Sequence, residues 1–185
     1  RLCRDWSSDV CSSDLVCDEI ESCGTIFEIN DTPHLEEYAI EVQLPFMKRL
    51  FPEAGLIPLI VDGNEFAAIT TVARALDLVL GSERETTLIA VSSNLSSSAL
   101  HVDATRQADV LLAMISQGDW HGLIRSRERK TSTACGCNAI AGVMATEMIA
   151  GSRVSILGRS DSSLLDGNNA ERIIHYAAAA WFPGG

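Results

Sequence analysis

The sequence is poor in positive charge. Its 185 residues include 14 lysines and arginines against 25 aspartates and glutamates, which gives a formal net charge of −11. The densest cationic run, Arg125 to Lys130, also contains a glutamate and is typical of a solvated loop. Because a polyanion needs a dense basic patch to bind, we expect neither nucleic acid nor an anionic membrane surface as a partner.

Long apolar runs and secretion signals are also lacking. No stretch of about 18 apolar residues occurs, so we predict no membrane span. The six cysteines include no zinc-type C-x-x-C pair, and no secretory signal peptide precedes them. These absences predict reduced thiols and a cytoplasmic location. What remains is a chain with 46% hydrophobic and 21% charged residues, long enough for one domain with a real core.

The first 15 residues differ from the rest. They lack apolar periodicity of either kind, and the stretch from Asp9 to Leu15 resembles the translation of a sequencing-library adapter. We therefore expect residues 1–15 to be a non-native segment that packs on nothing, and the native N-terminal part to be missing. Residues 16–185 would then be the C-terminal part of a single domain. The rival interpretation is a Ser-rich flexible tail.

From residue 16 onward, short apolar runs alternate with stretches of helical periodicity. The runs predict strands at 25–29, 56–61, 87–92, 153–157 and 175–182, and the periodic stretches predict helices at 34–51, 64–81, 108–118 and 135–149. Pro45 predicts a kink or a helix boundary near Val42. This alternation indicates an α/β fold. We expect a mixed or mainly parallel sheet flanked by helices and incomplete at the N-terminus.

The segment TACGCNAIAGVMA, Thr133 to Ala145, is the most specific local feature. Cys135 precedes a glycine where a helix is predicted to begin, and the positive field of a helix N-terminus favours a thiolate. A thiolate can act as a nucleophile or as a soft metal ligand, whereas the simpler interpretation is a small cysteine buried at a tight turn. Cys135 and Cys137 are too close for a comfortable disulfide but could bind a metal jointly.

Two further segments carry polar groups. In HLEEYAIEVQLPF, Glu37 and Glu41 form an i, i+4 pair that repels unless a cation or partner compensates, although a solvated helix face is the simpler interpretation. The predicted strand 87–92 runs into serines up to Ser98, with no acid, base or good metal ligand before His101. Ligands of open α/β sheets bind at the carboxyl ends of strands. A ligand bound at the end of this strand would therefore meet serine hydroxyls and an asparagine amide.

Four segments together resemble the Memo-like family, known in microbes as AmmeMemoRadiSam system protein B. In the family's order, they are EYAIEVQLPF, IPLIV, AVSSNLSS and TACGCNAI. The C-terminal residues up to Phe182 also resemble the family's last loop and strand, so the resemblance covers about residues 16–183. It implies a fold similar to that of class III extradiol ring-cleavage dioxygenases, whose pocket holds a non-haem iron.

The resemblance also implies a set of site residues. The family pocket contains two histidines from the N-terminal half, the histidine of an S-S-D-x-x-H segment and the cysteine of the C-G motif. By position, Cys135 matches that cysteine and is the candidate metal ligand. Asn94 stands in place of the aspartate, Ser97 in place of the histidine, and Tyr38 in place of the histidine of an E-H-S segment. We assign to the pocket the residues Asn94, Ser97, Tyr38, Glu41, Gly136 and Cys137, and we assign no catalytic residue.

These departures favour a binding protein with a degenerate pocket, because amides and hydroxyls neither ligate iron well nor transfer protons near pH 7. Its partner would be a small molecule or another protein. The alternative is a metal-dependent redox enzyme or dioxygenase in which Cys135 binds iron or copper with histidines from the missing half. A shifted loop could also return His101 to the pocket, and a third possibility is a chain without stable function. If the resemblance holds, Cys135 and the serine segment converge on one cleft with Tyr38 at its rim.

Overall fold

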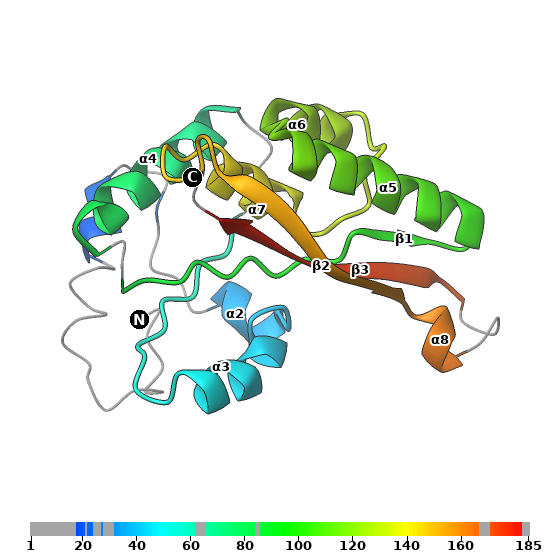
Figure 1. Cartoon of the computed structure of the whole chain (residues 1–185), viewed down its shortest axis with the longest axis horizontal. Helices are drawn as coiled ribbons and strands as arrows, with labels where there is room; N and C mark the ends of the chain where they lie inside the picture. Colours follow the sequence, from blue (N-terminus) through cyan, green and yellow to red (C-terminus); the bar gives the residue numbers. More distant parts are fainter. Residues whose placement is uncertain are drawn as a thin grey trace.

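The computed structural model describes residues 18–20, 22, 23, 27, 32–61, 66–83, 86–166 and 171–182 (Figure 1). The segment 1–15, expected to be non-native, lies outside these residues, as do most of the predicted strand 25–29 and Asn64, the predicted start of a helix. None of the helices in the described part of the chain is long and apolar enough to cross a bilayer.

Three strands form an antiparallel sheet. They are β1 (Ser96–Ser98), β2 (Arg153–Asp161) and β3 (Ile173–Phe182), in the order β1-β3-β2. The predicted α/β class is confirmed, but the expected parallel arrangement is wrong for these strands. The reason is that only a short connection joins β2 to β3, which permits an antiparallel hairpin, whereas a parallel pair needs a crossover of roughly a dozen residues or more.

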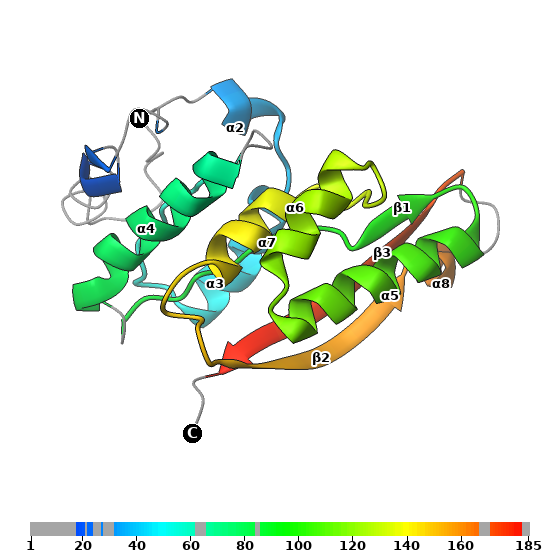
Figure 2. The ribbon, with the colours of Figure 1, turned by 90° about the horizontal axis from the view of Figure 1, so that it is seen from above.

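The β2–β3 pairing is interrupted once. It runs from Arg153 opposite Phe182 to Asp161 opposite His175, with a register shift between Ile156 and Gly158. Leu157 is the extra residue at this bulge, and its side chain is exposed. A bulge of this kind bends the strand and increases its twist, in keeping with the curved hairpin in Figure 2.

The N-terminal helical segment is broken into short pieces. The single helix predicted at 34–51 is replaced by α2 (Thr32–Glu36), the 3-10 turn η1 (Glu41–Gln43) and α3 (Leu44–Leu50). Pro45 lies in the first turn of α3, where a missing amide proton costs no helical hydrogen bond. The boundary expected near Val42 is therefore confirmed.

The longer helices follow the periodicity of the sequence. They are α4 (Phe66–Glu83), α5 (His101–Gln117), α6 (Trp120–Glu128) and α7 (Cys137–Met144), with the short α8 (Ser163–Asp166) near the end of β2. Gly118 ends α5 with a φ of 69°, a left-handed conformation that suits glycine. Arg125 to Lys130 was predicted as a loop, but most of it lies in α6, which Asp119 caps by accepting from the Gly122 amide at 2.8 Å.

Two predicted strands are not strands. Residues 56–61 and 87–92 have no regular secondary structure and form no ladder with any other described residue. Their apolar, β-branched composition favours an extended backbone, whereas a strand also needs a paired neighbour. Residues 87–94 therefore lead as an extended trace into β1 (Figure 1).

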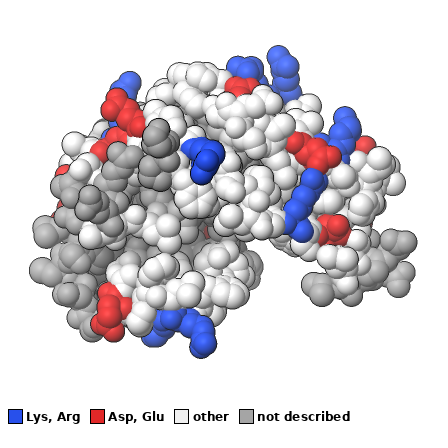
Figure 3. All heavy atoms as spheres, viewed as in Figure 1, with Lys and Arg blue, Asp and Glu red and all other residues white. Residues whose placement is uncertain are grey.

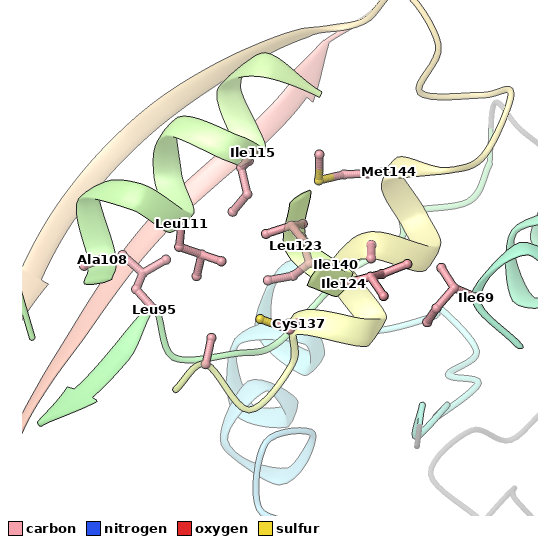
Figure 4. Close-up of a cluster of buried hydrophobic side chains, with 12 residues drawn as sticks. Ile69, Leu95, Ala108, Leu111, Ile115, Leu123, Ile124, Cys137, Ile140 and Met144 are labelled. Atoms are coloured by element: carbon pink, nitrogen blue, oxygen red, sulfur yellow. The ribbon is translucent and has the colours of Figure 1, made fainter. Parts of the chain in front are cut away.

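The hydrophobic core lies between the helices and one face of the sheet. Helix α5 contacts all three strands, α6 contacts α5 and α7, and α4 contacts α7 (Figure 2). The buried core side chains come mainly from the four longer helices and the segment before β1, and they include Ile69, Leu95, Leu111, Ile115, Leu123, Cys137, Ile140 and Met144 (Figure 4). The partly buried Val154, Ala177 and Trp181 of β2 and β3 pack against them. Because α7 contributes to this cluster, the loop that precedes it is fixed against the segment leading into β1.

Candidate functional site

Two loops distant in sequence meet at Cys135. The Cys135 amide donates to the side-chain oxygen Oδ1 of Asn94 at 2.9 Å, and the Gly136 amide donates to Ser93 Oγ at 2.9 Å. The Cys135 sulfur lies 3.8 Å from the same Ser93 oxygen. We call residues Ser92–Ser97 with Thr133–Gly136 the Cys135 junction. The predicted convergence of Cys135 with the serine segment is therefore seen in the structure.

Glycine is required at position 136 by this close approach. A Cβ at Gly136 would lie 2.6 Å from Ser93 Cβ and 3.0 Å from the Ser92 carbonyl oxygen. Such distances leave no room for a side chain. The predicted place of Gly136 in the site is thus a packing role: it lets the two backbones touch.

Ser93 is fully engaged in the junction. Its hydroxyl donates to the Asn94 carbonyl oxygen at 2.7 Å, and its oxygen accepts from the Gly136 amide. A hydroxyl has a single proton to donate. In the contact between Ser93 and Cys135, the thiol is therefore the donor and the serine oxygen the acceptor. The exposed Cys135 thiol is thus held at the junction by a weak hydrogen bond.

Ser97 lies at the other end of the junction, where it is hydrogen-bonded to the Arg172 guanidinium. Arg172 donates from Nε to Ser97 Oγ and from Nη2 to the Ser97 carbonyl oxygen, each at 2.9 Å. The Ser97 amide donates to Thr133 Oγ1 at 2.8 Å, and Thr133 donates to Gln107 at 2.7 Å. The family resemblance implies a histidine at position 97. This chain has a serine there, and its hydroxyl accepts a hydrogen bond from the Arg172 guanidinium.

Tyr38 and Glu41 lie on the surface near η1. Both side chains are exposed, and neither makes a hydrogen bond or ion pair with the junction in the part of the chain described here. The residue that links η1 to the junction is Gln43, whose Nε2 donates to Ser92 Oγ at 3.4 Å. Sequence reasoning did not single out Gln43, although it lies within the segment that resembles the family.

Cys137 lies in the core, unlike Cys135. It is 1% exposed and belongs to the cluster of buried hydrophobic side chains shown in Figure 4. Burial raises the pKa of its thiol, and this outweighs the opposing hydrogen bond with Ser132 and the positive charge of Arg127. Cys135 is exposed while Cys137 is buried, so the two thiols do not present a joint site at the surface.

The donors around Cys135 do not fit an iron or copper centre. Such a centre needs about three protein ligands among imidazole, thiolate and carboxylate. No group of three such side chains within the described residues includes Cys135. Its polar neighbours are a serine hydroxyl and an amide oxygen, and both already bind backbone amides.

A second group of titratable side chains lies apart from the junction. His101, Asp161 and His175 each place a potential ligand atom within 4.8 Å of those of the other two. Burial lowers the pKa of His175, and hydrogen bonds from Ser163 lower the pKa of Asp161. No local pattern in the sequence identifies this group, because what brings Asp161 and His175 together is the pairing register of β2 with β3.

The difference between the two thiols predicts a difference in reactivity. In the folded chain, iodoacetamide should modify Cys135 at least about 100-fold faster than Cys137, because the buried thiol reacts only after a local opening, and roughly 3 kcal/mol of opening free energy gives that ratio. Fragment-ion mass spectrometry of the peptide containing both cysteines measures it. The two rates should converge in urea. Comparable rates in the folded protein would contradict the burial of Cys137.

Comparisons with known proteins place the chain in a family. The model of the Memo-like protein family matches residues 10–180, a range that begins inside the segment expected to be non-native. A MEMO1 family protein of Sulfolobus acidocaldarius is 24% identical over 88% of this chain and 57% of its own length. One of Methanosarcina acetivorans is 28% identical over 84% of this chain and 58% of its own length, and one of Aeropyrum pernix is 25% identical over 76% and 50%.

No solved structure matches the chain significantly. The chain spans 50–58% of the length of these three curated relatives. The family match nevertheless covers most of the sequence, including the serine segment, the Cys135 loop and most of the β2–β3 hairpin. This chain therefore belongs to the Memo-like family.

Proposed function

We propose that this chain is a binding member of the Memo-like family and that the Cys135 junction holds a small polar molecule. The observation that carries the proposal is the neutral chemistry of the junction. Asn94 and Ser97 stand where an acid and a base are expected from the family resemblance. In the junction each uses an oxygen as an acceptor, so the Asn94 amide group and the Ser97 hydroxyl proton remain as donors to a ligand. Such groups can hold a ligand by hydrogen bonds but cannot transfer protons near neutral pH.

The charges near the junction bear on the class of ligand. Arg172 places a guanidinium on Ser97, so a ligand with a carboxylate or another anionic group is favoured there. Nucleic acid is not favoured, because the chain carries a net charge of −11 and the basic side chains on the face drawn in Figure 3 are scattered among acidic ones. The described cysteines are free, in keeping with our proposal of a cytoplasmic location.

Protection of the exposed thiol tests the proposed binding. The iodoacetamide reaction of Cys135 is followed by mass spectrometry in the presence of a panel of small neutral and monocarboxylate compounds. We expect some of the compounds to slow the modification of Cys135 and not that of Cys23, which is the internal control. Arg172→Gln should reduce protection by the carboxylates about 10-fold, as expected for loss of one charge-assisted contact, and should leave protection by neutral compounds unchanged. A panel without any protective compound would argue against a ligand site at the junction.

The alternative is a metal-dependent redox enzyme or dioxygenase that uses Cys135. It draws support from the exposure of the thiol and from the length of the relatives, since histidines from outside these 185 residues would have to complete an iron or copper centre. The test is anaerobic loading with Fe(II) of a longer chain that supplies such histidines, followed by catechol and oxygen. Oxygen consumption that is abolished by Cys135→Ala would favour the enzyme over the binding protein.

A further inference from the structure

Three side chains from three elements meet at one end of the sheet. His101 opens α5, Asp161 ends β2, and His175 lies near the start of β3. Figure 1 shows these three ends at the same end of the molecule, and Figure 2 agrees. Asp161 and His175 are directly opposite in the β2–β3 ladder, so their side chains share a face of the sheet. His101 Nε2 lies 3.7 Å from Asp161 Oδ2, and its ring lies edge-on to that of His175 at 5.6 Å.

Thr105 determines which imidazole nitrogens are free. Its hydroxyl donates to the His101 carbonyl oxygen at 2.9 Å, which uses its one proton. Its oxygen also lies 3.3 Å from His101 Nδ1 and 3.3 Å from His175 Nε2. Since the hydroxyl has no second proton, both imidazoles must donate to it from these nitrogens. The unshared lone pairs are then on His101 Nε2 and His175 Nδ1.

His175 Nδ1 is left without a partner. His175 is 4% exposed, and Nδ1 is a buried side-chain nitrogen with no hydrogen-bond partner among the described residues. A buried polar atom without a partner is unfavourable and calls for an explanation. A lone pair that faces no donor is also the state in which imidazole binds a metal.

One carboxylate oxygen of Asp161 is held by hydrogen bonds, and the other faces His101. Ser163 donates to Asp161 Oδ1 from its amide at 2.9 Å and also from its hydroxyl. Oδ1 is therefore occupied, whereas Oδ2 faces His101. Outer hydrogen bonds that fix the orientation of each ligand, as Thr105 and Ser163 do here, are the usual second layer of a protein metal site.

We propose that His101, Asp161 and His175 bind a divalent first-row transition ion, with zinc as the probe. Two nitrogens and one carboxylate oxygen are the donor set of open three-ligand zinc sites. Atoms around a tetrahedral zinc lie about 3.4 Å apart. Each of the three side chains has a potential ligand atom within 4.8 Å of one from each of the other two, so side-chain rotations suffice to bring them onto one ion.

The ion can reach the site from solvent. The His101 side chain is 55% exposed and that of Asp161 is 19% exposed, while His175 is buried.

The site is separate from the Cys135 junction. Ser96 pairs with His175, and its side chain points to α5, where it donates to the Ala104 carbonyl oxygen at 2.7 Å. Alternation along β1 therefore places the Ser97 side chain on the opposite face of the sheet.

Zinc binding to the untagged, chelator-treated chain tests the proposal. Competition with a chromophoric chelator gives the affinity, mass spectrometry gives the stoichiometry, and Co²⁺ absorption reports the ligand field. We expect one Zn²⁺ per chain. Loss of an outer hydrogen bond costs roughly 10–100-fold in affinity, so Thr105→Val should weaken binding by about that factor. His101→Gln and Asp161→Asn, which remove a ligand, should weaken it by at least about 100-fold.

Three matched variants should bind zinc as the unmodified chain does. Thr105→Ser keeps the hydroxyl, His121→Gln removes an exposed histidine elsewhere, and Cys135→Ser removes the thiol of the junction. Circular dichroism confirms that each variant is folded. Unchanged affinity in both His101→Gln and Asp161→Asn, or loss of binding in Cys135→Ser, would overturn the proposed site, as would a chain that binds no zinc. The measurement is independent of the thiol-protection experiment, which is done without metal, so one proposal can fail while the other stands.

Discussion

Leu111→Ala is expected to lower the free energy of unfolding by about 2–5 kcal/mol, the range for a leucine removed from a well-packed core. Leu111 is 1% exposed and belongs to the buried cluster in Figure 4, where it points from α5 toward the other core side chains near Leu95, Ala108 and Ile115. The cost combines the lost transfer of the side chain out of water with the cavity left behind. Urea unfolding followed by circular dichroism measures it.

Val110→Ala is the matched control for this change. Val110 is the neighbouring residue of the same helix and is 52% exposed, so its truncation removes little buried area and should change stability by less than about 0.5 kcal/mol. Equal effects of the two substitutions would show that α5 does not pack on the sheet through the face that carries Leu111.

Gly136→Ala is expected to destabilise the fold by about 1–3 kcal/mol, as overpacking does, and to open the Cys135 junction. The added Cβ would meet the Ser92 carbonyl oxygen at 3.0 Å, and a backbone atom cannot rotate away. To make room, the loops must separate, which breaks the bonds from Cys135 to Asn94 and from Gly136 to Ser93. Urea unfolding and the alkylation rate of Cys135 report the two consequences.

Gly81→Ala is the control for this substitution. A Cβ at Gly81, within α4, meets nothing within 4 Å, and alanine is the better helix former, so this variant should be as stable as the original chain or slightly more so. If Gly136→Ala were equally stable and Cys135 reacted at an unchanged rate, the close approach of the two loops would be wrong.

Local pattern was enough to predict α4, the C-terminal part of α5, the start of α7 and the last two strands, whereas α6 and α8 were not predicted. Apolar spacing of 3.6 residues predicted α4 and α5, and Gly118 marked the end of α5 because few other residues adopt its left-handed conformation. The prediction of α7 from 135 to 149 was too long, since the helix runs only from Cys137 to Met144. Apolar composition continues beyond its end and so gave no signal to stop.

Pairing between distant segments could not be predicted in the same way. The apolar run 87–92 has a strand-like composition but no paired neighbour among the described residues, and the direction of the sheet depends on which strands are joined by short connections. The contact of Cys135 with Asn94 was predicted only through the family resemblance. The group of His101, Asp161 and His175 was missed because it depends on the register of β2 on β3 and on where α5 begins.

The bulge in β2 has a consequence for association between molecules. Among the described strands, β2 lies at an edge of the sheet, where unpaired backbone groups can accept a strand from another chain. Leu157 divides the β2–β3 ladder into two runs of four pairs, 153–156 and 158–161. A strand from another chain would need the same bulge to pair along the whole edge. A regular extended peptide could therefore form hydrogen bonds with only one of the two short runs of β2. Deletion of Leu157 would straighten this edge and make the chain more prone to form fibrils at high concentration.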